Sequence, residues 1–211
     1  TGAGLARGLT LGSRLKAQLV DLDAPPPADF RPNAFLRISP DGSVEVIAKH
    51  DEMGQGIHTG IAIVICEELE VPVERVSVVP SPADPAYANS AYFVQVTGGS
   101  TSTWSSFDQL RKAGAAARMM LVEAAAKKWQ VSAGDCRAVD GEVIHPDGAA
   151  RISYGELVAD AANISVPGED EIRLKDPKDF KQIGKPTPRV DSPAKVRGTA
   201  IFSLDQQVPG M

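Results

Sequence analysis

A glycine-rich turn between an apolar β-like run and an apolar helix-like run constrains this fold most. The turn is HDEMGQGIHTG, residues 50–60. Before it, residues 43–49 (SVEVIAK) alternate apolar and polar side chains, as a half-buried strand does. After it, apolar residues recur every four positions from Ile57 to Leu69, as on one face of a helix. A strand, a tight turn and a helix in this order predict a mixed α/β fold.

Other segments of the chain predict further elements around this unit. A β-hairpin is expected for AFLRIS and SVEVIAK, because Pro40-Asp41-Gly42 between them is typical of a turn. The remaining elements are a strand in VERVSVVPS, a long helix from Trp104 to Trp129 rich in Ala and Gly, a small hairpin around Asp140-Gly141, and a short helix with Ser153 and Glu156 as a capping box. We therefore expect β-hairpins and two principal helices packed on a small sheet.

Two glycine-rich turns are expected to precede the two long helices. Gly54-Gln55-Gly56 comes before Ile57, and residues 97–102 (TGGSTS) come before Trp104. The unpaired amides of a helix N-terminus and nearby hydroxyls suit phosphate groups, so two such turns are compatible with an anion that has two ends. The GxGxxG and GxxxxGK[ST] patterns are both absent, because Gly60 comes one position too late for the first. Spacing alone leaves anion binding and ordinary tight turns equally open at each place.

Composition excludes several classes of protein. The chain of 211 residues is 43% hydrophobic and has a net charge of −5 with a pI near 5.2. This balance argues against a nucleic-acid partner, and no apolar run approaches the ~18–20 residues that cross a bilayer. With only Cys66 and Cys136, a zinc or iron–sulfur site within this chain is not expected. A disulfide between them remains an alternative to two buried free thiols.

The two ends differ in composition from the middle. Residues 1–31 mix small, apolar and basic residues with a proline-rich stretch, which we interpret as an export-signal remnant and lead-in. Residues 164–195 are rich in proline and charge and are expected to form a surface linker. Residues 196–211 alternate Ala200, Phe202 and Leu204 as a strand does, which predicts the first strand of a further domain.

The segment EMGQGIHTG resembles the MGQG segment of the xanthine oxidase/aldehyde oxidase family of molybdenum hydroxylases. The order of further segments, AYANS…TGGSTS, AGAAAR, ISYGEL and DSPAKVRGTAIFSLDQQVPGM, resembles the molybdopterin-binding β subunit of isoquinoline 1-oxidoreductases within that family. The similarity extends from about Pro32 to Met211. It implies that residues 32–163 form part of a molybdenum cofactor-binding domain and that residues 196–211 begin a hammerhead-type domain.

The resemblance also implies the cofactor and the residues that hold it. Met53, Gly54, Gln55 and Gly56 would lie against the molybdopterin, with the Gln55 amide donating to and accepting from its mixed edge. The second set, along the pyrophosphate and nucleotide of a molybdopterin cytosine dinucleotide, comprises Gly98, Gly99, Ser100, Thr101 and Ser102.

The implied reaction hydroxylates an N-heterocycle or aldehyde with oxygen from water, and electrons leave through 2Fe–2S centres. The family's catalytic glutamate and cluster cysteines have no counterpart here, so no catalytic residue and no metal ligand are assigned. The implied partners are the remainder of the large subunit and a small 2Fe–2S subunit. A periplasmic or membrane-associated location is expected, with a cytoplasmic one as the alternative.

Two other functions remain compatible with the residues alone. One is a nucleotide- or phosphate-binding module without redox activity, and the other is an α/β subunit-interaction domain. Several polar and aromatic residues have simpler structural interpretations. We expect Glu67, Glu68 and Glu70 to form a solvated face, Trp104 and Trp129 to pack in the core, and His58 to cap or pack rather than bind a ligand. For Tyr87, Asn89 and Tyr92, loop packing and a substrate funnel are equally open.

Overall fold

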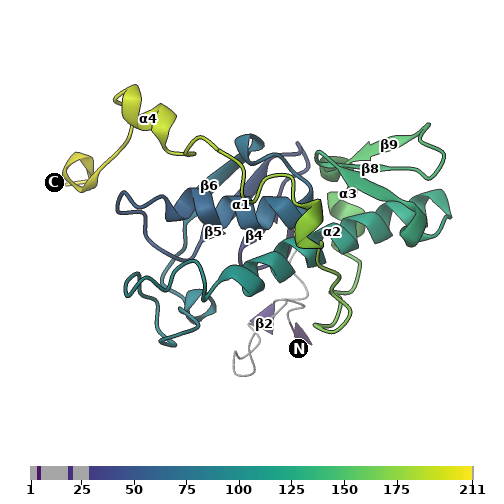
Figure 1. The fold of residues 1–211 in the computed structure, drawn as a ribbon, viewed down its shortest axis with the longest axis horizontal. Helices are drawn as coiled ribbons and strands as arrows, with labels where there is room; N and C mark the ends of the chain where they lie inside the picture. The colour runs from purple at the N-terminus through teal and green to yellow at the C-terminus, as the bar shows by residue number, and fades with distance from the viewer. Residues whose placement is uncertain (1–3, 6–18, 21–28, 211) are drawn as a thin grey trace.

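The computed structural model describes residues 4–5, 19–20 and 29–210. The expected export-signal remnant and lead-in, residues 1–31, lie mostly outside the described residues; the short pair β1 (Gly4–Leu5) and β2 (Leu19–Val20) and residues 29–31 are described there. From Phe30 onward the chain forms one body of two small sheets and two long, crossing helices (Figure 1). The expected mixed α/β architecture is confirmed.

A four-stranded sheet with the order β3-β4-β5-β6 forms the first layer. Neighbours are antiparallel except β5 and β6, which are parallel and joined by α1 as a β–α–β crossover. Val44, Val46 and Ala48 of β5 are buried, as their alternation predicted. The elements of this layer are β3 (Phe30–Asn33), β4 (Leu36–Ile38), β5 (Val44–Ala48), α1 (Ile57–Leu69), η1 (Val73–Arg75) and β6 (Val76–Pro80).

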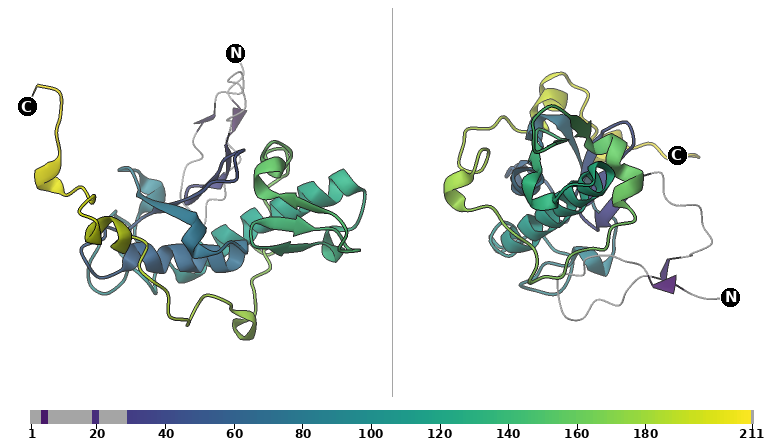
Figure 2. Two further views of the ribbon diagram at one scale, coloured as in Figure 1. Left: turned by 90° about the horizontal axis from the view of Figure 1, so that it is seen from above. Right: turned by 90° about the vertical axis from the view of Figure 1, so that its right-hand side faces the viewer.

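The long helix α2 (Phe107–Trp129) crosses α1 and extends beyond the sheet (Figures 1 and 2). Gly114 makes the close crossing possible, because a Cβ at this position would lie 2.5 Å from the carbonyl oxygen of Ile65. The expected close packing of the Ala/Gly-rich helix is thus confirmed, with α1 as its partner. Trp104 lies before the helix and is 67% exposed, so its assignment to the core was wrong, whereas Trp129 is half-buried against the core.

The far end of α2 carries a second, three-stranded sheet and a short helix (Figure 1). The predicted capping box is present: the Ser153 hydroxyl accepts from the Glu156 amide, and the Glu156 carboxylate accepts from the Ser153 amide. Cys66 and Cys136 are both buried free thiols, as expected. The elements are η2 (Pro85–Tyr87) before α2, then η3 (Ala133–Asp135), β7 (Arg137–Val139), β8 (Glu142–Ile144), β9 (Arg151–Ser153) and α3 (Tyr154–Ala161).

Residues 164–191, which we call the return segment, run back from α3 across α1 (Figures 1 and 2). Its central part is fixed by Glu67 and Glu68 of α1, both 0% exposed. The expected solvated face was therefore wrong for these two residues. Charged residues at the end of a helix are usually exposed to solvent. Here the return segment covers this end of α1 and supplies hydrogen-bond donors to both carboxylates.

The last residues form no strand in the described structure, contrary to the expected strand over Ala200, Phe202 and Leu204. After η4 (Pro177–Asp179), the chain forms α4 (Ser192–Val196) and η5 (Ser203–Asp205). Phe202 and Leu204 are exposed. A strand needs a neighbour for its backbone hydrogen bonds, and no described strand lies beside this segment. The start of a hammerhead-type domain here stays a prediction. Among the described residues, no helix has the length and apolar character needed to cross a bilayer.

Candidate cofactor-binding site

The turn between β5 and α1, residues 51–57, is organised by the side chain of Glu52. Its carboxylate accepts from the amides of Gly54 and Gly56, both at 2.9 Å, and of His58 at 3.2 Å. Burial alone would raise the pKa of Glu52, but these amides and the Arg189 guanidinium lower it overall. The helix N-terminus therefore already holds an anion from its own chain. This removes the interpretation that the same amides bind a phosphate.

Glycine is required in this turn by backbone geometry. Gly54 and Gly56 have φ of 108° and 90°, a region that other L-residues rarely adopt. The Gln55 amide accepts from the Met53 amide at 2.8 Å and donates to the Asp51 carbonyl at 2.9 Å. One N–H and one carbonyl lone pair of Gln55 stay outside these two bonds, so it can still both donate to and accept from a ligand.

The second turn, residues 97–103, is organised by the buried Asn89. Its amide donates to the Thr101 hydroxyl at 2.8 Å, and that hydroxyl donates to the Gly98 carbonyl at 2.8 Å. Gly99 has φ of 60°, and a Cβ there would lie 2.4 Å from the Tyr92 hydroxyl. Tyr87 and Asn89 serve loop packing, since Tyr87 is buried and donates to the Ala34 carbonyl. Helix α2 begins only at Phe107, so residues 97–102 do not form its N-terminus.

His50 and Asp51 bring the two turns together. His50 Nδ1 lies 3.2 Å from the Val96 carbonyl and its Nε2 lies 3.0 Å from the Ser106 hydroxyl. Because a carbonyl can only accept, Nδ1 carries the proton and Nε2 accepts from Ser106. Burial, and then the charge of Lys49, lower the pKa of His50, which favours this neutral ring. The Asp51 amide also donates to the Thr97 hydroxyl at 2.8 Å. His58 has the structural role expected of it, since its Nε2 donates to the His50 carbonyl.

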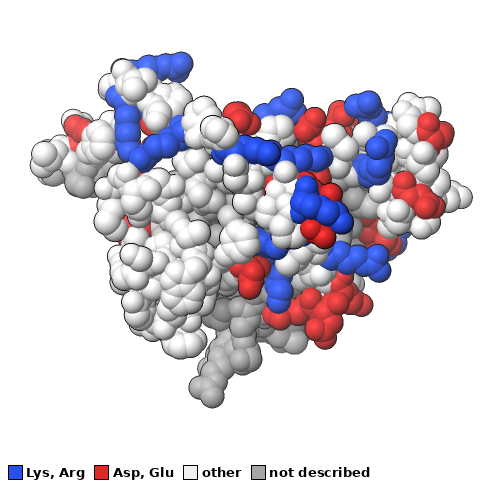
Figure 3. All heavy atoms as spheres, viewed as in Figure 1, with Lys and Arg blue, Asp and Glu red and all other residues white. Residues whose placement is uncertain are grey.

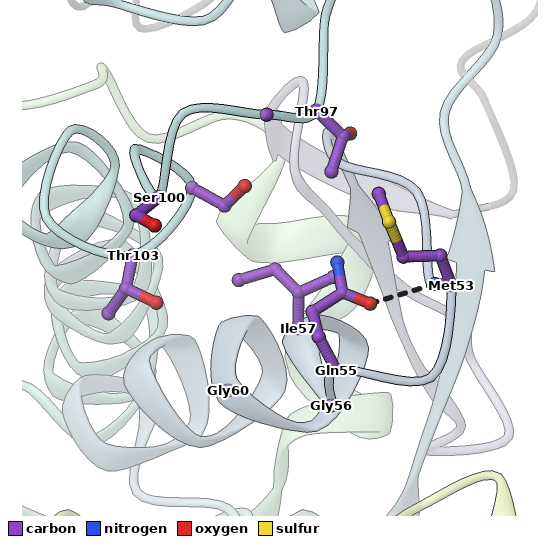
Figure 4. A pocket seen from close by; sticks show the side chains of 10 residues that line it. Met53, Gln55, Gly56, Ile57, Gly60, Thr97, Ser100 and Thr103 are labelled. Atoms are coloured by element: carbon purple, nitrogen blue, oxygen red, sulfur yellow. Dashed lines mark hydrogen bonds between the residues drawn. The ribbon is translucent and has the colours of Figure 1, made fainter.

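A pocket of about 400 Å³ lies between the two turns (Figure 4). Its lining is uncharged and mixes polar and apolar side chains, with glycine backbone on both sides. From the first turn and α1 come Met53, Gln55, Gly56, Ile57 and Gly60; from the second turn come Thr97, Gly98, Ser100, Ser102 and Thr103. The surface on the side of the second turn is also uncharged, because the sequence has no charged residue between Asp84 and Asp108 (Figure 3). The described residues contain no group of three or more His, Cys, Asp or Glu side chains that could hold a metal ion.

Most of the residues predicted for the site line this one pocket. Met53, Gln55, Gly56, Gly98, Ser100 and Ser102 do so. The other three support the turns instead: Gly54 gives its amide to Glu52, Gly99 turns the chain beside Tyr92, and Thr101 is only 4% exposed and holds the second turn together.

Sequence reasoning missed several residues at or beside the pocket. Ile57, Gly60, Thr97 and Thr103 line it. Gly60 carried a signal, because a glycine inside an otherwise regular helix often marks a place where something approaches the backbone. Thr97 and Thr103 directly flank the predicted segment. Glu52 and Arg189 support the first turn from outside the pocket, and the pattern of residues gave no sign of their pairing.

The chain belongs to the family of molybdopterin cofactor-binding domains of the molybdenum hydroxylases, since that domain family matches residues 7–199. The family resemblance expected from the sequence is thereby confirmed. The chain is 35% identical to isoquinoline 1-oxidoreductase subunit beta of Brevundimonas diminuta, over 87% of this chain and 28% of that protein. It is 34% identical to a membrane-bound aldehyde dehydrogenase [pyrroloquinoline-quinone] of Gluconacetobacter polyoxogenes, over 100% of this chain and 27% of that protein.

Among solved structures, quinoline 2-oxidoreductase from Pseudomonas putida 86 is similar with a TM-score of 0.47. The sequence identity is 22%, over 66% of this chain and 17% of that structure. The chain thus spans less than a third of the length of each of these relatives.

Proposed function

We propose that this chain is the cofactor-binding portion of a molybdenum hydroxylase large subunit and that its pocket holds part of a molybdopterin cytosine dinucleotide. One observation carries the proposal: the two glycine-rich turns, separated by some forty residues of sequence, line the same pocket. In this proposal Met53, Gln55 and Gly56 contact the pterin, while Gly98, Ser100 and Ser102 contact the pyrophosphate and nucleotide. Gly54, Gly99 and Thr101 fix the two turns.

The residues present fit such a molecule. A Cβ placed on Gly56, Gly60 or Gly98 would meet no atom within 4 Å, so at these three positions the backbone faces open space that a ligand can fill. The hydroxyls of Thr97, Ser100, Ser102 and Thr103 offer donors to phosphate oxygens. The Gln55 amide, held in place by Met53 and Asp51, can pair with a heterocycle edge that both donates and accepts.

The division of labour between the two turns follows from charge. The Glu52 carboxylate lies behind the first turn and would repel a phosphate, so the uncharged heterocycle belongs at that side. The second turn carries hydroxyls and no carboxylate, which suits the phosphates. Within the described structure no Lys or Arg lines the pocket, so neutral donors of this chain would bind them.

Bound there, the molybdenum centre would supply the hydroxylation of an N-heterocycle or aldehyde with oxygen from water. The names of two relatives, an isoquinoline oxidoreductase and an aldehyde dehydrogenase, support this range of substrates. This chain would bind and orient the cofactor and exclude water from one side of it. The remainder of the large subunit would supply the rest of the pocket, and a small 2Fe–2S subunit would receive the electrons.

The experiment is to purify the full-length protein with its partner subunits and measure molybdenum and the nucleotide released on denaturation. We expect molybdenum and CMP in equal amounts. A nucleotide without molybdenum would support the redox-inactive nucleotide-binding module, and neither ligand would support the interaction domain. Because one relative's name includes pyrroloquinoline quinone, that quinone is assayed in the same extract, and its presence in place of molybdenum would also contradict the proposal.

A substitution inside the pocket links that result to this site. Gly60→Leu adds a side chain that meets no described atom near its Cβ, and leucine favours the helix more than glycine by about 0.5–1 kcal/mol. We expect the variant to fold normally and to lose most of its molybdenum and CMP. The matched control is Gly134→Leu on the exposed turn η3, outside the pocket, which should retain both. Equal cofactor content in the two variants would place the cofactor elsewhere.

A further inference from the structure

The return segment ends at the first turn of the pocket. Its Arg189 donates through Nη1 to the Gly54 carbonyl at 2.7 Å and through Nη2 to the Glu52 carboxylate at 3.1 Å. Asp191 fixes the guanidinium from the other side, at 3.0 Å from Nε and 2.8 Å from Nη2. Next to it, the Val190 amide donates to the Thr59 hydroxyl at 3.1 Å. A residue more than 130 positions away therefore contacts the backbone of the glycine-rich turn directly.

Glu52 is where the two sets of contacts meet. The same carboxylate oxygen accepts from the Gly54 amide, the Gly56 amide and Arg189. Gly54 is thus held through both of its backbone groups. Its N–H donates to Glu52, and its C=O accepts from Arg189. Glycines at φ near 100° adopt many other conformations at little cost, so such a turn stays in one conformation only where hydrogen bonds select it.

We propose that Glu52 and Arg189 form a clamp that positions the turn for ligand binding, with Arg189 as a positioning residue supplied by the return segment. Neither side chain lines the pocket. Their effect passes through Gly54 to Met53, Gln55 and Gly56, which do. The clamp rests on the proposed function for its consequence on the cofactor, while the ordering of the turn itself does not depend on which ligand binds.

The test uses the full-length protein with its partner subunits and two measurements. The first is hydrogen exchange of peptides covering residues 51–60, and the second is molybdenum content per protein. We expect Arg189→Gln and Glu52→Gln to speed exchange in this peptide by about tenfold or more, because charge-assisted hydrogen bonds are lost. Molybdenum content should fall by a similar factor, as when a supporting residue behind a bound group is removed. Arg189→Lys should give an intermediate result, since lysine keeps the charge but not the fork of donors.

The matched control is Arg173→Gln, which removes the same charge from the same return segment. Arg173 is exposed, and its guanidinium makes no ion pair or hydrogen bond with the described residues. Peptides from α2 report on whether each variant has folded, and they should exchange as in the parent protein. Exchange of residues 51–60 at the parent rate in both Arg189→Gln and Glu52→Gln would overturn the clamp.

The clamp and the proposed function fail in different ways. Faster exchange of the turn in a protein that contains no molybdenum would leave the clamp standing and remove the cofactor assignment. A molybdenum-containing protein whose variants keep both normal exchange and full molybdenum would retain the assignment and overturn the clamp. Faster exchange of α2 in Arg189→Gln would show that Arg189 stabilises the whole fold, which would also count against the clamp. Arg189→Lys is the second variant that tests whether the turn alone is affected.

Discussion

Glutamate side chains lie at both ends of α1, in opposite electrostatic surroundings. At the N-terminus, Glu52 faces the positive end of the helix dipole and accepts hydrogen bonds from three backbone amides beside the pocket. Near the C-terminus, Glu67 and Glu68 face the negative end of the dipole, where a carboxylate is unfavourable, and yet both are fully buried. The difference is explained by what covers each end.

The C-terminal end is covered by the return segment, which brings the donors. Glu67 accepts from Lys175 Nζ at 2.6 Å and from the amides of Lys181, Gln182 and Ile183 at 2.7–3.1 Å. Burial alone would raise the pKa of Glu67, but Lys175 and these amides lower it to about 2.

Glu68 of α1 is held by α2 and the return segment together. Arg111 of α2 donates to it at 2.7–2.8 Å, and the Lys175 amide donates at 3.1–3.2 Å. The Arg111 guanidinium also contacts the rings of Phe107 and Phe180, with its Cζ 5.6 Å and 5.0 Å from their centroids. One end of α1 therefore borders the candidate cofactor pocket, and the other attaches the return segment, which brings Arg189 to the first turn of that pocket.

Removing Glu67 tests this comparison most severely. Glu67→Ala would leave the amides of residues 181–183 without their acceptor in a covered region and would leave the Lys175 ammonium paired with Glu70 alone, so we expect a loss of about 3–5 kcal/mol in the local free energy of opening. The measurement is native-state hydrogen exchange of peptides covering residues 175–183 in the full-length protein. Glu74→Ala, at an exposed residue of η1, is the control and should cost less than about 0.5 kcal/mol. A loss below about 1 kcal/mol for Glu67→Ala would show that the return segment is held by other contacts.

The contrast also shows where sequence reasoning ended. The strand, turn and helix around the pocket were predictable, because alternation in β5 and the four-residue repeat in α1 are local signals. The residues alone made the two turns compatible with one ligand that has two ends, and the family resemblance turned this into an expectation for named residues. The burial of Glu67 was not predictable, because the donors that permit it lie more than a hundred positions away.

The same limit applies to isolated residues. A tryptophan beside a predicted helix looks the same in sequence whether it is buried or exposed, because its exposure depends on which segments cover the side chain. Trp104 is exposed. The strand expected over residues 200–204 had the right alternation but no partner among the described strands. Arg189 stands in a proline-rich stretch whose composition predicted a linker, and only the fold shows that it contacts Gly54.

Acid should weaken the C-terminal end of α1 by a somewhat smaller amount. The folded pKa of Glu67, about 2, lies below its ordinary value of 4.5, so its contribution is complete above pH 4.5 and is lost as the pH falls toward 2. We expect the opening free energy of residues 181–183 to fall by about 3 kcal/mol across this range, after correction for intrinsic exchange rates. Glu67→Gln cannot titrate and serves as the control. A parent protein and a Glu67→Gln variant with the same acid dependence would exclude Glu67 as the cause.

The smallest change in stability is expected at the C-termini of α1 and α2, which end in the same way. Glu70 and Gln130 both follow their helices at φ of 59°, a left-handed conformation that favours glycine. Glu70 also pairs with Lys175 and Lys181 at 2.7 Å and 2.8 Å, whereas the Gln130 side chain makes no hydrogen bond with the described residues.

We therefore expect Gln130→Gly to stabilise the C-terminal turn of α2 by about 0.5–1 kcal/mol, because it relieves backbone strain and removes nothing. Glu70→Gly gains the same relief but loses ion pairs worth up to about 1 kcal/mol, so its net effect should be close to zero. Exchange of the last turn of each helix provides the measurement. An equal gain in both variants would mean that the Glu70 ion pairs contribute nothing to the attachment of the return segment, which would leave Glu67 and Glu68 as its only charged anchors on α1.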